Sequence, residues 1–152
     1  MARAPVVDIQ QRGVPEATRE LRQVGERGSD MRRIGGKVRT VYRGATQRQF
    51  ESKSGWPPLA GSTKERKARD GLDPRPLRAT GALYRSMTAS SAADQIDVRE
   101  PDELRFGTTV PYAQFHEYGR GVPQRKLLVI SPADEIEIER ILAAYIIQGR
   151  SW

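Results

Sequence analysis

Apolar residues recur with helical spacing over the first third of the chain. Successive members of the series are 3, 7, 3, 4 and 3 positions apart, which places them on one face of a helix. The series consists of Leu21, Val24, Met31, Ile34, Val38 and Val41. Pro15 favours a helix start, whereas Gly25, Gly28 and the pair Gly35-Gly36 each cost about 1 kcal/mol relative to alanine inside a helix. The pattern predicts a helix from Pro15 to about Phe50, broken near one of these glycines.

The next segment, residues 51–61, contains Trp56-Pro57-Pro58-Leu59 and cannot be helical, because the two prolines fix their own backbone and extend the residue before them. We expect an extended loop that Trp56 and Leu59 pin to the core. The spacing of Ser62 and Glu65 is that of a capping box, so a short basic helix is predicted over about 62–69, ended by Asp70-Gly71.

Strand signals dominate the middle of the chain. After a possible cap at Thr80 and a single helical turn, residues 86–92, 95–100 and 103–109 predict three antiparallel strands. A last strand is predicted over Leu127–Ile130.

Two more helices are predicted nearby. Residues 111–118 begin with proline and carry Tyr112, Phe115 and Tyr118 at a spacing of three, with Gly119 as the stop. A terminal helix starts at Ser131-Pro132 and has a clear apolar stripe. That stripe comprises Ile138, Ile141, Leu142, Tyr145 and Ile146. The expected fold class is therefore α+β: N-terminal helices, a small, mostly antiparallel sheet of about four strands, and the aromatic and C-terminal helices packed on it.

The composition limits the chemistry. The chain has 152 residues, no cysteine and one histidine, which excludes disulfides, a thiol nucleophile and zinc sites built from thiolates or several imidazoles. No cofactor or metal is expected. Apolar runs are far shorter than a membrane span, and the N-terminus lacks a signal-like apolar core, so we expect an intracellular product not exported by a classical route. Residues 1–13 show no period and are expected to form a flexible arm, with 14–152 as one α+β domain.

Charge leaves two interpretations open. The 26 Lys and Arg against 19 Asp and Glu give a net charge of +7. A basic run, Lys64, Arg66, Lys67 and Arg69, could neutralise phosphates, but a solvated helix face explains it equally well. A small basic nucleic-acid-binding protein is therefore an alternative function.

An enzyme is a third hypothesis. His116-Glu117 could supply a general base, yet no second oriented group is visible beside it, so a structural or interfacial role for His116 is favoured. The aromatic series Tyr112, Phe115 and Tyr118 could form a cofactor platform, but such spacing is more typical of a core or a subunit contact.

Four sequence blocks, taken together and in this order, resemble a known family. They are Phe50…Gly55-Trp56-Pro57-Pro58-Leu59…Thr63…Lys67, then Leu77-Arg78-Ala79-Thr80-Gly81-Ala82-Leu83…Ser86, then Gly107-Thr108…Val110-Pro111-Tyr112-Ala113…Phe115-His116-Glu117-Tyr118-Gly119, and Val122-Pro123-Gln124-Arg125-Lys126-Leu127-Leu128. Over roughly residues 40–146 the chain resembles the phage virion morphogenesis and tail-completion proteins, small neck proteins of long-tailed phages that include the minor tail protein Z type. The last block departs from the usual Pro-Ala-Arg-Pro-Phe-Leu by losing the second proline and the aromatic.

The resemblance implies a non-enzymatic structural subunit of the virion that forms a ring, expected to be hexameric, and completes the tail where it joins the head connector. Its expected partners are copies of itself and neighbouring neck, connector and tail-tube or tail-terminator proteins. In such a ring Lys64, Arg66, Lys67 and Arg69 could face passing DNA. We further expect Trp56, Tyr112 and Tyr118 to pack the loop 51–61 against the sheet and short helix, and Arg125 to pair with a carboxylate of this chain or its neighbour.

Overall fold

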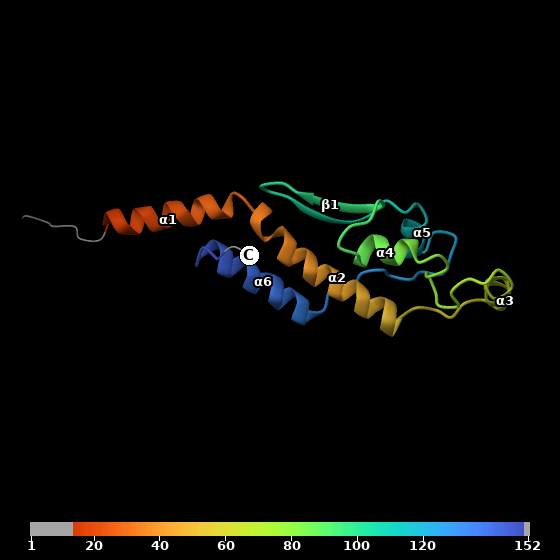
Figure 1. Ribbon diagram of the computed structural model, residues 1–152. Coiled ribbons are helices and arrows are strands. Elements are labelled where there is room, and N and C mark those ends of the chain that lie inside the picture. The colour runs from red at the N-terminus through yellow and green to blue at the C-terminus, as the bar shows by residue number, and fades with distance from the viewer. Residues whose placement is uncertain (1–13, 151–152) are drawn as a thin grey trace, which may run out of the picture.

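A computed structural model of the chain describes residues 14–150, and these residues form an elongated α+β molecule dominated by helices (Figure 1). In order, the elements are α1 (Val14–Gly28), the 3-10 turn η1 (Arg32–Ile34), α2 (Gly35–Ser52), α3 (Gly61–Arg69), α4 (Ala82–Thr88), β1 (Gln95–Arg99), β2 (Leu104–Thr108), α5 (Ala113–Tyr118) and α6 (Pro132–Ile146). The arm expected over residues 1–13 lies outside the described residues. Among residues 14–150, no helix combines the length and the apolar character that crossing a bilayer requires.

The long N-terminal helix is interrupted, as the glycines predicted. α1 ends at Gly28, and α2 begins at Gly35. Between them, the Met31 amide donates to the Pro101 carbonyl (2.8 Å) and the Ser29 hydroxyl donates back to the Glu26 carbonyl (2.8 Å). The break therefore lets the chain turn from the projecting α1 into the body of the molecule.

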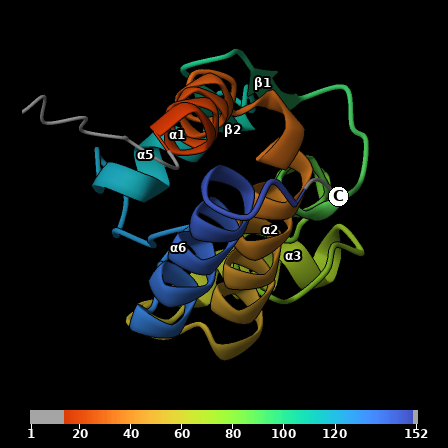
Figure 2. The same ribbon diagram turned by 90° about the vertical axis from the view of Figure 1, so that its left-hand side faces the viewer.

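Helices α2 and α6 lie side by side and run in opposite directions (Figures 1 and 2). The predicted apolar stripes meet there and form a first core, with Ile34 and Val38 against Ile141 and Tyr145. The Tyr145 hydroxyl donates to the Asp30 carbonyl (2.7 Å), which ties α6 to the turn before α2. The start of α6 was also predicted correctly, because a capping box between Ser131 and Asp134 closes its first turn.

The sheet is smaller than predicted. β1 and β2 form an antiparallel hairpin with Gln95 opposite Thr108 and Arg99 opposite Leu104, as expected for residues 95–100 and 103–109. Within residues 14–150 these two strands are the whole sheet, so the expectation of four strands is wrong.

Both missing strands have a physical explanation. Residues 86–88 end helix α4, where the hydroxyls of Ser86 and Thr88 bond back to the carbonyls of Leu83 (2.8 Å) and Tyr84 (2.7 Å). Residues 127–130 have no regular structure, and the Leu127 amide donates to the Glu117 carboxylate (2.7 Å) instead of to a neighbouring strand. Side-chain partners thus replace the sheet ladder in both segments.

The expected capping box at the start of α3 is also absent. α3 starts one residue early, at Gly61, and its N-cap is Ala60, with no side-chain hydrogen bond. Ser62 is therefore already inside the first turn, where its hydroxyl no longer occupies the capping position.

A second core lies at the other end of α2. It gathers five buried residues, Phe50, Leu83, Val110, Ala113 and Leu127. The half-buried Trp56 packs edge-on against Phe50 with ring centroids 5.1 Å apart, and its indole Nε1 donates to the Lys126 carbonyl (2.8 Å). Trp56 therefore pins residues 53–60, the proline loop between α2 and α3, to the core as predicted. Tyr112 and Tyr118 lie outside this core and are 42% and 65% exposed.

We expect Trp56→Phe to lower the free energy of unfolding by about 1 kcal/mol, because the phenyl ring keeps the contact with Phe50 but loses the hydrogen bond to Lys126. Urea denaturation followed by circular dichroism measures this change. An unchanged midpoint would mean that the indole hydrogen bond contributes nothing to stability.

Candidate functional site

The four sequence blocks that carry the resemblance converge on one cleft. Its volume is about 600 Å³, and it lies at the end of the molecule that holds α3 and α5 (Figure 1). The proline loop and α3 form one wall, the segment around Leu77 and Ala79 a second, and α5 with the loop after it a third. Residues far apart in the sequence therefore build a single site.

Five of the nine residues singled out from the sequence line this cleft: Arg66, Lys67, Tyr112, His116 and Arg125. Trp56 lies behind the loop in the core, and Lys64, Arg69 and Tyr118 are exposed outside the cleft lining. Apolar residues of the four blocks complete the walls. They include Leu59, which the sequence predicted to pin the loop, and Leu77 and Val122, which were not singled out from the sequence.

Arg125 fastens the proline loop to the cleft. Its side chain is only 4% exposed, and Nε and Nη2 donate to the Pro57 carbonyl (3.2 and 2.9 Å), while Nη2 also donates to Pro58 (3.1 Å). Burial lowers the pKa of this guanidinium. Within the described chain its partners are carbonyls and not the expected carboxylate. A charged pair with a neighbouring subunit stays a prediction.

Lys67 also acts as a tether. Its ammonium donates to the carbonyls of Asp73 (2.9 Å) and Arg75 (2.6 Å), and the residue is 5% exposed. Burial lowers its pKa, against the opposing attraction of Asp73. Lys67 thus does not present its charge to solvent as the DNA-facing prediction requires. Lys64, Arg66 and Arg69 are exposed on the same helix, and Arg69 pairs with Asp70 (3.0 Å).

His116 is half-buried, and its Nδ1 atom is enclosed without a hydrogen-bond partner. Burial, and then the positive charge of Arg125, lower the pKa of this imidazole, although a hydrogen bond with the Pro123 backbone opposes the shift. The adjacent Glu117 carboxylate accepts from the Leu127 amide. The dipeptide is therefore used to shape the cleft, since Glu117 holds the loop that follows α5.

His116 should make stability depend on pH in a specific direction. Its pKa in the folded chain is depressed, so the unfolded chain binds a proton more readily once the pH falls below about 6.5. Stability contributed by the neutral imidazole is present above that pH and is lost as the pH falls. We expect the melting temperature to drop from pH 7 to pH 5 more steeply in the wild type than in His116→Gln. Because the chain has one histidine, equal slopes would contradict this assignment.

The cleft is electropositive. Its lining contains Arg66, Lys67 and Arg125 but no aspartate or glutamate, and the rest is apolar or aromatic apart from Thr63 and His116. Tyr112 stands partly exposed in the same wall. Buried aromatics and arginines in an apolar setting are the side chains that dominate protein interfaces. The arrangement therefore suits a segment that carries apolar groups and a carboxylate.

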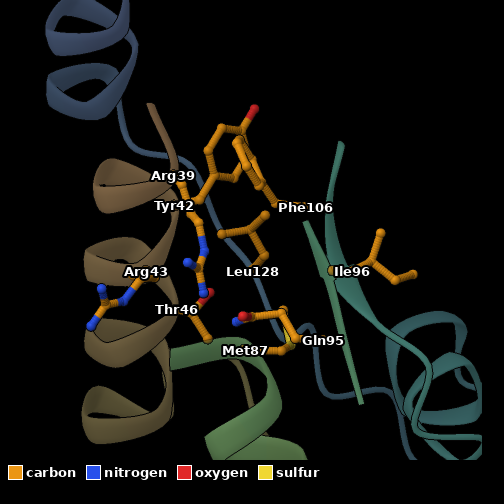
Figure 3. A pocket seen from close by; sticks show the side chains of 10 residues that line it. Arg39, Tyr42, Arg43, Thr46, Met87, Gln95, Ile96, Phe106 and Leu128 are labelled. Atoms are coloured by element: carbon orange, nitrogen blue, oxygen red, sulfur yellow. The ribbon is translucent and has the colours of Figure 1, made fainter. Parts of the chain in front are cut away.

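A second cavity lies between α2, α4 and the hairpin but has a volume of only about 20 Å³, room for roughly one water. Figure 3 shows Tyr42 and Leu128 lining this cavity. Phe106 lies beside Tyr42, with 5.7 Å between the ring centroids. Arg39 donates across the cavity to the carbonyls of Ala89 (2.8 Å) and Ser90 (3.0 Å). This cavity is a small gap in the packing between α2, α4 and the hairpin, and it is too small for a ligand.

Comparison with known protein families supports the resemblance that the four sequence blocks carry. Residues 9–146 match the profile of the phage virion morphogenesis family. The match covers most of the chain, so the protein belongs to this family of phage morphogenesis proteins. Neither a search of curated proteins nor a search of solved structures found a match.

Proposed function

We propose that the protein is a structural subunit of the neck of a long-tailed phage, where it completes the end of the tail and joins it to the head connector. The subunits form a ring, proposed to be hexameric, in the virion after assembly in the host cytoplasm. The observation that carries the proposal is the family match over residues 9–146, because a morphogenesis family implies a role in building the particle rather than in catalysis.

The shape and surface of the chain support an assembly role. α1 projects from the body (Figure 1), and Leu21 on it is largely exposed. The C-terminal end of α1 is tied to the end of α6 by Arg27, which donates to the carbonyls of Ile146 (2.9 Å) and Ile147 (3.0 Å). The projecting part of such a helix is marginal in water without a covering partner. The cleft adds apolar and basic groups at the opposite end of the molecule. A subunit that exposes such surfaces at both ends is suited to contacts with neighbours on either side.

An early stop codon in this gene, followed by negative-stain electron microscopy of the lysate, tests the proposal. We expect filled heads lying apart from tails, or tails of irregular length. Supplying the wild-type chain in trans should restore joined particles, which controls for effects on neighbouring genes. Normal infectious particles without the protein would overturn the neck role.

The exposed cations Lys64, Arg66 and Arg69 on α3 favour a second candidate, nucleic-acid binding, either by a free protein or by DNA passing through a ring. A gel shift over a salt series separates the two cases. Tight binding that weakens steeply with salt favours an independent nucleic-acid-binding protein, whereas weak binding favours the neck subunit. Lys64→Glu combined with Arg69→Glu should abolish any such shift while leaving Lys67 and its tether intact.

A further inference from the structure

We propose that the basic cleft receives the outer face of helix α6 from a second copy of the chain, so that Glu135, Ile136 and Glu139 of one subunit dock between α3 and α5 of the next. This inference rests on the proposed ring, and it names the two surfaces that form the contact between its subunits.

The cleft offers both an apolar pocket and unused positive charge. Its three cations face no carboxylate in the lining, and the bonds that hold Lys67 and Arg125 go to neutral carbonyls. Among the described residues, the Nη1 atom of Arg125 makes no hydrogen bond, so its donors remain available. Arg66 adds an exposed guanidinium in the same lining. A docking carboxylate would therefore meet the guanidinium groups of Arg66 and Arg125, which form no ion pair within residues 14–150.

Helix α6 carries the complementary surface. Its inner face packs on α2, but Ile136 points away from that contact and is 58% exposed. Residues three and four apart share a helix face, so Glu139 flanks Ile136 one turn later, and Glu135 precedes it. Neither carboxylate forms an ion pair within residues 14–150. An apolar anchor with two free carboxylates beside it matches the composition of the cleft.

These two surfaces cannot satisfy each other within one chain. α6 contributes no residue to the cleft, and the α3 end of the molecule lies well away from α6 (Figure 1). A contact between two different patches of identical chains is head-to-tail, and repetition of it closes a ring when the rotation between copies permits. A helix that lays an apolar residue into a groove is also a common mode of recognition.

Engineered cysteines test the contact directly, because the natural chain has none. The variant Ala60→Cys, Ala133→Cys places one thiol on the cleft lining and one in the first turn of α6. Mild oxidation of concentrated protein, and of particles assembled from the variant, should give a ladder of disulfide-linked oligomers on a non-reducing gel. The matched control is Ala60→Cys, Ala93→Cys, whose second thiol replaces an exposed alanine in the turn before the hairpin. Ladders no stronger than the control in both samples would overturn the proposal.

Charge reversal gives an independent measurement in the phage. We expect Glu135→Arg to lower the titre at least tenfold, and Arg66→Glu in the same chain to restore most of it. Asp102→Arg, at the exposed tip of the hairpin, is the control and should leave the titre unchanged. Lack of rescue together with control-level cross-linking would exclude this interface. The two proposals fail separately. If the stop codon still separates heads from tails, the neck role stands even when this interface is excluded. If the stop codon leaves normal particles, the neck role is overturned, and cross-linking then tests only whether the chains associate through these two surfaces.

Discussion

Replacing Phe50 with alanine is expected to lower the free energy of unfolding by about 3–5 kcal/mol. Phe50 is fully buried where the end of α2 meets the proline loop and α4. Its ring contacts Trp56 at 5.1 Å and Tyr84 at 5.3 Å between centroids. Truncation would leave a cavity that these larger rings cannot fill without moving, so both the transfer energy and the packing contacts are lost.

Urea denaturation followed by circular dichroism gives this value, and Phe115→Ala is the matched control. Phe115 is the same residue type but is exposed on α5, so its truncation should change stability by less than about 0.5 kcal/mol. If the Phe50→Ala chain does not fold, Phe50→Leu, with an expected loss of about 1–2 kcal/mol, keeps the comparison measurable. Equal effects at Phe50 and Phe115 would contradict the burial of Phe50.

Replacing Arg125 with methionine is expected to lower the free energy of unfolding by about 2–4 kcal/mol, because the carbonyls of Pro57 and Pro58 lose their charged donor in a partly buried setting. Methionine keeps much of the side-chain volume, so the change isolates the hydrogen bonds. The proline loop should loosen more than the rest of the chain. Limited proteolysis is therefore expected to cleave residues 53–60 faster in the variant.

Arg120→Met is the control for this experiment. Arg120 is exposed and lies over the Tyr118 ring at 5.3 Å, so its removal should change stability by less than about 1 kcal/mol. Arg125→Lys should recover only part of the loss, because an ammonium cannot copy the planar guanidinium that reaches both carbonyls. Wild-type stability and proteolysis in Arg125→Met would show that Arg125 does not hold the loop.

Elements with a strong period were predictable from the sequence. The stripe that ends in Val38 and Val41, and the one through Ile141 and Tyr145, gave the α2–α6 pair because burying an apolar face outweighs other preferences. The hairpin followed from its turn at Pro101-Asp102. The segments 86–92 and 127–130 were not predictable, since their backbone is decided by partners that are distant in sequence or by hydroxyls that bond back into a helix.

The candidate site was predictable in its members but not in their roles. Resemblance to a family singled out Tyr112, His116 and Arg125 but could not say that they face a common cleft. The roles of Lys67 and Arg125 depend on loop carbonyls, and a carbonyl has no signature in a sequence. A basic run therefore suggested DNA contact for Lys67, where the fold uses that charge as a tether.

Helix α2 contributes to both cores, with Val38 in one and Phe50 in the other. Twelve residues of helix separate them by about 18 Å, farther than the range over which substitutions usually interact. Changes in the cleft can therefore accumulate during evolution without disturbing the packing of α6, and the reverse also holds. A protein that must keep pace with changing neighbours gains from such insulation, because α2 preserves the spacing between the two cores while each core repacks separately.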